Sequence, residues 1–147
     1  MKNMTKVMLA AAATGVVLMA GVVRAQDDED TRELVKVSEH WRLHLLKDMR
    51  EGLFVQVQEI LAATGEGDMK TVEALATERG KAHFKKMDPA MMKELPMGMK
   101  GMGKGMHLAF DDVAAAARTG DSTAVAGAVS DLMLACTACH MTYKLNP

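Results

Sequence analysis

Both cysteines of this 147-residue chain stand near its end, in the stretch CTACHMTYK. Cys136 and Cys139 are separated by two residues, and His140 follows directly. Three chemistries use such a group: a redox-active dithiol, half of a structural zinc site, and covalent attachment of haem through two thioethers, with the histidine as a ligand of the iron. The surroundings of the group distinguish them.

The motif lies on a predicted helix from about Thr123 to Lys144, which follows the capping segment Thr119-Gly120-Asp121-Ser122. Helical spacing places six of its residues on one face: Val129, Met133, Cys136, Cys139, His140 and Tyr143. Because this face is largely apolar, we expect it to point toward the interior of the fold.

Two of the three chemistries lack what they need. A reactive dithiol lies at the N-terminus of a helix that follows a strand, whereas this pair lies in the last turns of a helix. A structural zinc site needs four ligands, and the remaining histidines form no second pair of the required kind, although His40 and His44 are four residues apart. Haem attachment needs only the two thiols and the adjacent imidazole, so the motif favours it.

Four amphipathic segments indicate an all-α fold of one domain. Apolar residues recur at three- and four-residue steps, and Gly or Pro separates the periodic parts, which predicts helices over about 30–63, 68–86, 106–118 and 123–144. Asp68 is the predicted N-cap of the second helix, and Leu108, Val113, Ala114 and Ala117 are expected to face inward on the third. Such helices with short connections predict an antiparallel up-and-down four-helix bundle over residues 26–147.

The N-terminus has the pattern of a secretory signal peptide. Lys2 and Lys6 precede an apolar run from Val7 to Val23, and Ala25 stands at the predicted cleavage position. An uncleaved membrane anchor is the alternative. Cleavage after Ala25 removes three cations and no acid, so the formal charge changes from −1 to −4. We therefore expect a periplasmic domain without a nucleic-acid partner, because it has neither a basic stripe nor stacking aromatics.

The position of the motif on the last helix of a bundle resembles the cytochrome c′ family of class II c-type cytochromes. Two stretches carry the resemblance. In CTACHMTYK, the family has a tyrosine and then a basic residue at the offsets of Tyr143 and Lys144. In WRLHLLK, the family's aromatic–Arg pair corresponds to Trp41 and Arg42, and the residue over the distal haem face corresponds to Leu46.

The resemblance implies one covalently attached haem c per chain, with His140 as the proximal iron ligand. It implies an electron carrier that serves periplasmic redox proteins and can pair through its first two helices. Leu46 over the iron would leave an open site for NO or CO. Met49, three residues further along the same helix, would instead supply a sulfur ligand, and His44 is a third choice. No base and nucleophile stand together, so we expect no enzyme activity.

A methionine-rich stretch, PAMMKELPMGMKGMGKGM, separates the second and third predicted helices. Pro96 and four glycines predict a loop here, after one short helical turn. Spaced thioethers can bind Cu(I), but methionine more commonly covers an irregular apolar edge such as the haem rim, and we favour this second role.

Overall fold

The computed structural model describes residues 29–147, so the predicted signal peptide 1–25 lies outside the described residues. Contacts divide the chain into 1–30 and 31–147, and the features below belong to the second unit. Its first element is a strand, β1 (Glu33–Val35), where a helix was expected from Asp30. That expectation was wrong because alternation governs this stretch: Val35 and Val37 are buried while the residues between and before them are exposed.

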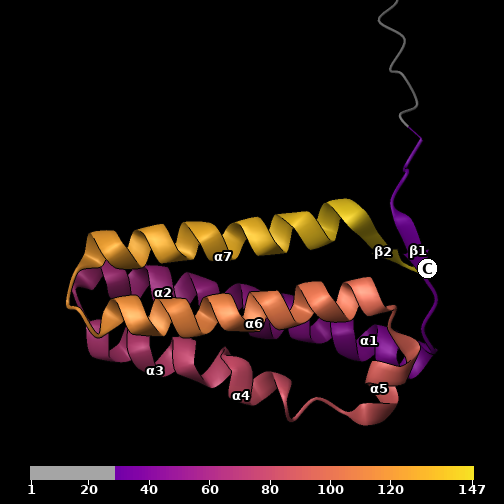
Figure 1. The fold of residues 1–147 in the computed structure, drawn as a ribbon, viewed down its shortest axis with the longest axis horizontal. Helices are drawn as coiled ribbons and strands as arrows, with labels where there is room; N and C mark the ends of the chain where they lie inside the picture. Colours follow the sequence, from indigo (N-terminus) through magenta and orange to yellow (C-terminus); the bar gives the residue numbers. More distant parts are fainter. Residues whose placement is uncertain (1–28) are drawn as a thin grey trace, which may run out of the picture. The chain divides into compact units, whose positions relative to one another are not determined.

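Strand β1 pairs in parallel with β2 (Tyr143–Leu145), so that Glu33 lies opposite Tyr143 and Val35 opposite Leu145 (Figure 1). Beyond the ladder, the backbone N–H of Asn146 donates to the carbonyl oxygen of Val35 at 3.1 Å. The last residues of the chain are therefore held against the segment that precedes the first helix.

The first long helical segment consists of three parts: α1 (Glu39–Lys47), the π-helical turn η1 (Asp48–Leu53) and α2 (Phe54–Glu66). It ends at Gly67, whose φ of 76° favours glycine. Relative to a continuous α-helix, the extra residue of a π-turn rotates what precedes it by about 100°. Before this turn, Leu45 is buried in the second apolar cluster described below, whereas Leu46 is 43% exposed.

The second segment begins as predicted, because the Asp68 side chain accepts a hydrogen bond from the N–H of Thr71 at 3.1 Å. It does not continue to Lys86 as one helix. It divides at Gly80 into α3 (Met69–Arg79) and α4 (Lys81–Phe84). Gly80 is extended, and a Cβ there would overlap the carboxylate of Asp111, which caps α4 by accepting from the N–H of Lys81 at 3.0 Å.

In the stretch 89–106, the short helical turn that was expected first is α5 (Pro89–Glu94). The loop predicted after it is wrong, because the first half of α6 (Met97–Ala117) forms there. Each helical glycine costs about 1 kcal/mol relative to alanine, so packing elsewhere along α6 must offset the cost. Phe110 and Val113 are fully buried on this helix, and Gly98 leaves room for the Tyr143 hydroxyl. Leu108, which was expected inside, is 38% exposed.

The last helix is α7 (Ser122–Thr142). Its N-cap is Asp121, whose side chain accepts a hydrogen bond from the N–H of Thr123 at 2.8 Å. It ends before Lys144 because β2 takes over at Tyr143. Within the described part of the chain, α7 alone is long and apolar enough to cross a membrane by length and composition. That is weak evidence of a membrane span, since a core helix of a soluble protein can satisfy the same test. Leu134 and Met141 on α7 are exposed.

The described chain is mostly helical with two short strands, which is compatible with the expected all-α class. Helix α6 packs against α7 and α3, and α2 packs against α3 and α7 (Figure 1). Two apolar clusters stabilise this arrangement. The first is formed by α2, α3, α6 and α7 and includes Ile60, Val72, Phe110, Val125 and Leu132. The second includes Val35, Val37, Leu45, Met91 and Leu95, and lies at the end where β1 and β2 meet.

Candidate functional site

A pocket of about 290 Å³ adjoins the second cluster, where the two ends of the described chain come together. This volume is close to the lower end of the usual range for small-molecule and cofactor sites, about 300–1,000 Å³. Cys139 and His140 line it from α7, and Tyr143, Lys144 and Leu145 continue the wall along β2.

The opposite wall comes from α1 and the π-turn. Leu45 and Leu46 on α1, and Met49 on η1, line the pocket together with Met99 of α6. Both of the predicted distal residues, Leu46 and Met49, therefore lie across the pocket from the cysteine–histidine motif. Met49 is half-buried and also packs against the first cluster.

Strand pairing brings a cation to the same place. Arg32 directly precedes β1 and lines the pocket, and its Nη1 donates to the carbonyl oxygen of His140 at 3.4 Å. The backbone N–H of Val37 donates to the Asn146 side-chain oxygen at 3.0 Å, which fixes this junction from the other end of β1. Arg32 and Lys144 give the pocket two cations, and none of its described lining residues is Asp or Glu. The pocket thus combines mostly apolar walls with positive charge from these two side chains.

Cys136 and Cys139 are half-buried free thiols one turn apart on α7. Burial raises the pKa of both thiols, and Cys136 raises that of Cys139 further. At neutral pH they are therefore protonated, whereas a reactive dithiol of the oxidoreductase type needs a lowered pKa. The His140 side chain is exposed, and Cys136 does not line the pocket itself.

A structural zinc ion needs four ligands that converge on it. Across residues 29–147, no three His, Cys, Asp or Glu side chains gather in a way that could hold a metal ion. A four-ligand zinc site at Cys136 and Cys139 would therefore need ligands that these residues do not place nearby.

Other predicted site residues lie outside the pocket. Arg42 pairs with Glu39 at 3.2 Å along α1. Trp41 packs against the second cluster and makes an edge contact with the His40 ring at 4.5 Å. His44 borders a separate hollow next to Asp48. Of the three predicted distal choices, the pocket thus brings Leu46 and Met49, but not His44, to the motif.

Methionines of the 87–106 stretch have packing roles. Met91 is buried in the second cluster, Met87, Met92 and Met99 pack against it, and Met99 reaches the pocket. These contacts support the expected apolar-edge role for those residues.

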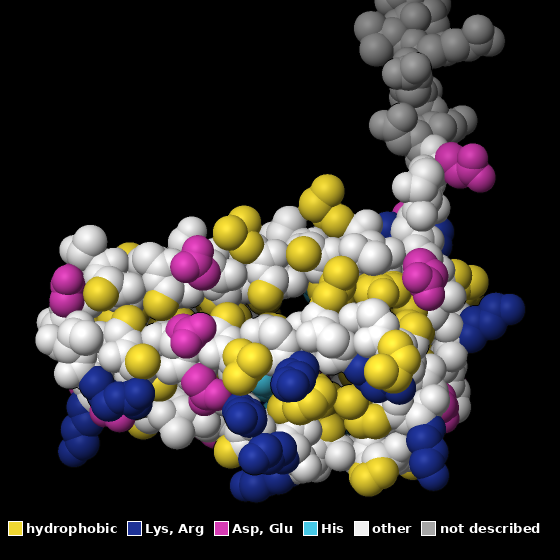
Figure 2. Space-filling model, in the orientation of Figure 1, with side chains coloured by type: hydrophobic (Ala, Val, Ile, Leu, Met, Phe, Trp, Pro, Cys, Tyr) yellow, Lys and Arg dark blue, Asp and Glu magenta, His cyan; other side chains and the backbone are white. Residues whose placement is uncertain are grey.

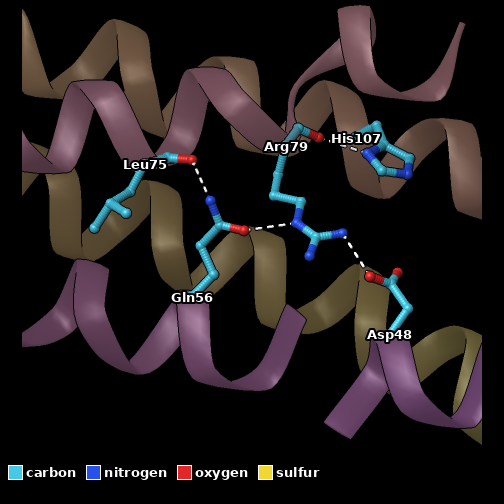
Figure 3. A network of polar contacts seen from close by, with 5 residues as sticks. All are labelled: Asp48, Gln56, Leu75, Arg79 and His107. Atoms are coloured by element: carbon cyan, nitrogen blue, oxygen red, sulfur yellow. Dashed lines mark hydrogen bonds and ion pairs between the residues drawn. The ribbon is translucent and has the colours of Figure 1, made fainter. Parts of the chain in front are cut away.

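A buried polar network holds the π-turn that carries Met49 (Figure 3). Arg79 Nη1 donates to Asp48 Oδ1 at 2.8 Å, and Arg79 Nε donates to Gln56 Oε1 at 2.6 Å. Gln56 Nε2 donates in turn to the carbonyl oxygen of Leu75 at 2.7 Å. Gly52 is needed beside them, because a Cβ there would overlap the Arg79 guanidinium. In an unbroken α-helix Asp48 would be turned away from α3, so the ion pair and the π-turn require each other.

Two stacked histidines lie next to this network. The rings of His83 and His107 are 5.3 Å apart, and His107 is buried with its Nδ1–H donating to the carbonyl oxygen of Arg79. Burial lowers the pKa of both histidines, and the positive charge of Arg79 lowers it further. Both imidazoles are therefore neutral in the folded protein near pH 7.

We expect the free energy of unfolding to fall as the pH is lowered below about 6.5, because the unfolded chain takes up protons on these histidines before the folded chain does. Their contribution is fully present above that pH. Denaturant unfolding between about pH 5 and about pH 8 measures it. His107→Gln should flatten the slope, whereas replacing the exposed His44 in the same way should not. An unchanged slope in His107→Gln would contradict the assignment.

Sequence reasoning missed Arg32 and Met99 as pocket residues. Arg32 was placed within the expected first helix, and Met99 within a loop. The alternation of Val35 and Val37 was a signal for the strand, but nothing local indicates its partner at Tyr143.

Compared with family models, with curated proteins and with solved structures, the chain has no significant match.

Proposed function

We propose that the chain is an exported electron-transfer protein, a cytochrome c of the cytochrome c′ type with one haem c in an antiparallel four-helix bundle. The observation that carries the proposal is the pocket. It sets Cys139 and His140 opposite Leu46 and Met49, within mostly apolar walls and beside Arg32 and Lys144.

The thiols of Cys136 and Cys139 are suited to thioether formation because both are protonated and one turn apart. Each would add across a vinyl group, with sulfur bonding to one carbon and the hydrogen passing to the other, so that no electrons are gained or lost. His140 Nε2 or Nδ1 would then offer its lone pair to the iron from the same turn of α7.

The bound haem would supply a one-electron iron couple. The apolar walls at Leu45, Leu46 and Met49 would exclude water from it, and the two cations would balance its carboxylates. Burial and these charges are the means by which this chain sets the reduction potential.

The position of Met49 favours electron transfer, because Met49 can supply a sulfur ligand and Leu46 cannot. Its side chain is half-buried between the pocket and the first cluster, whereas Leu46 is 43% exposed and covers the pocket less completely. A thioether held in this way could supply a sulfur ligand to the iron, which would favour electron transfer without ligand exchange.

A gas-binding function is the second candidate. The distal wall offers Leu45, Leu46 and Met49, none of which carries an N–H or O–H on its side chain. If Met49 does not ligate, the distal side is open and apolar, which would favour NO or CO over O₂.

Optical spectra separate the two functions. We expect the ferric wild-type protein to be low-spin, with a sulfur-to-iron charge-transfer band, and Met49→Leu to be high-spin and to bind CO when reduced. Met133→Leu on the exposed side of α7 is the matched control and should leave the spectrum unchanged. A high-spin wild-type protein that binds CO and is indifferent to Met49→Leu would favour gas binding instead.

Pairing of two copies remains part of the proposal. Four exposed apolar side chains lie on α1 and α2: Leu43, Phe54, Val55 and Leu61. A dimer formed through the first two helical segments would cover them.

A further inference from the structure

Positive charge is concentrated in one short part of the chain. Residues 81–104 contain six lysines and two acids, a formal charge of +4, whereas the other residues of 29–147 contain nine Lys or Arg and fifteen Asp or Glu, a formal charge of −6. The six are Lys81, Lys85, Lys86, Lys93, Lys100 and Lys104. A domain that is acidic as a whole therefore carries a basic region on α4, α5 and the first half of α6.

The charges of this region are not neutralised within the described chain. Across residues 29–147, none of the six lysine ammonium groups forms an ion pair. The two acids have other partners: Asp88 accepts from the N–H of Ala90 at 2.7 Å, and Glu94 accepts from the N–H of Ser38 at 2.6 Å and from its hydroxyl at 3.0 Å. The surface thus keeps its positive potential toward solvent.

Apolar side chains lie among the lysines. Figure 2 shows dark blue side chains bordering a yellow patch over α4 and α6. In this segment Met92, Met99 and Met102 are half-buried, and Met97 is 78% exposed. By helical spacing Met97 lies on the same side of α6 as Lys100 and Lys104, whereas Met99 and Met102 lie on the other side. We call the six lysines and Met97 the lysine–methionine face. Unbranched thioethers adapt to differently shaped partners, and methionine is common on such binding surfaces.

The face adjoins the pocket. Gly98, the neighbour of Met97, lies against the hydroxyl of Tyr143, which lines the pocket, and Met99 lines the pocket from the other side of α6. A partner that covers Met97 would therefore lie beside the pocket, at the start of α6.

We propose that the lysine–methionine face docks an acidic protein surface, and that this partner exchanges electrons with the proposed haem. The inference rests on the proposed function. An acidic protein fits better than an anionic membrane, because Met97 is the one exposed large apolar side chain within residues 81–104, whereas membrane-binding helices insert several large apolar side chains. Electrostatic steering toward such a face raises association rates and weakens with salt.

Ferricyanide, a small anionic oxidant, tests the sign of the charge at the electron-exchange surface. If the net charge of −4 expected for the domain governed the encounter, the protein would repel ferricyanide. The rate of oxidation would then rise with salt, because salt screens the repulsion. The lysine–methionine face predicts the opposite: oxidation of the reduced holoprotein should slow by about tenfold between about 0.01 M and about 0.15 M salt, as screening shortens the Debye length. A rate that rises with salt would overturn the proposal.

Charge reversal locates the effect. Lys93→Glu with Lys104→Glu should abolish the salt-dependent slowing, whereas the control Lys70→Glu with Arg118→Glu, which changes the net charge equally on exposed residues outside the face, should preserve it. Equal effects of the two double variants would overturn the assignment to this face.

A haem-independent measurement keeps the two proposals distinguishable. A fluorescent decaglutamate peptide should bind the full-length protein at low salt, and the Lys93→Glu, Lys104→Glu variant should bind it about tenfold more weakly than the control does. A colourless protein that still binds the peptide through the face would refute the proposed function and leave the docking face standing. Sedimentation with phosphatidylglycerol vesicles without peptide binding would overturn the choice of a protein partner.

Discussion

Replacement of both Cys136 and Cys139 by serine is expected to abolish haem that resists acid–acetone extraction, whereas the wild-type protein should stay coloured. The two thiols are half-buried, protonated and one turn apart on α7, which is the arrangement that two thioethers require. Serine preserves the size of each side chain but cannot form the carbon–sulfur bond. The loss should therefore be complete, because no other cysteine exists in the chain.

The matched control replaces Thr137, which lies between the two cysteines on the exposed side of α7, by serine. It should retain extraction-resistant haem at the wild-type level. Haem that survives extraction from the double-serine variant would contradict the attachment, and a colourless wild-type protein would contradict the proposed function as a whole.

Arg79→Met is expected to lower the free energy of unfolding by about 3 kcal/mol, the order expected when a buried, hydrogen-bonded charge pair is broken. The Arg79 side chain is 12% exposed, and its loss leaves Gln56 Oε1 buried without its donor. It also frees Asp48, so the π-turn that carries Met49 loses its link to α3.

Denaturant unfolding measures the effect, and Arg118→Met is the control. Arg118 also pairs with a carboxylate, that of Glu73 at 3.2 Å, but its side chain is 55% exposed. Exposed pairs contribute about 0–1 kcal/mol, so this variant should be close to wild type. Equal losses from both arginine variants would show that burial of the Arg79 network contributes nothing.

Local signals in the sequence were sufficient for several elements. Asp68 caps α3 through a hydrogen bond to Thr71, only three residues away, and Asp121 caps α7 in the same local manner. The CxxCH spacing singled out Cys139 and His140, whereas Leu46 came from the resemblance to the cytochrome c′ family and Met49 from its place three residues further; all four line the pocket. The two caps could be predicted because each depends on residues within one helical turn.

The errors all depend on distant partners. The glycines of 98–105 indicated a loop, yet α6 forms because its later residues pack against α7 and α3. Nothing near Asp48 indicates a π-turn, since the turn is held by Arg79, 31 residues away. Arg32 was missed as a pocket residue because its place depends on a strand that pairs with Tyr143.

The parallel pairing of β1 with β2 also determines when the pocket can be completed. Val37 and Asn146 are bonded across a separation of 109 residues, and closing so long a loop is entropically costly until the intervening helices have formed. The wall of the pocket that β2 forms is therefore expected to be among the last parts of the fold to order, after α2, α3, α6 and α7 have packed. Until then Cys139 and His140 line a pocket that is open on the β2 side.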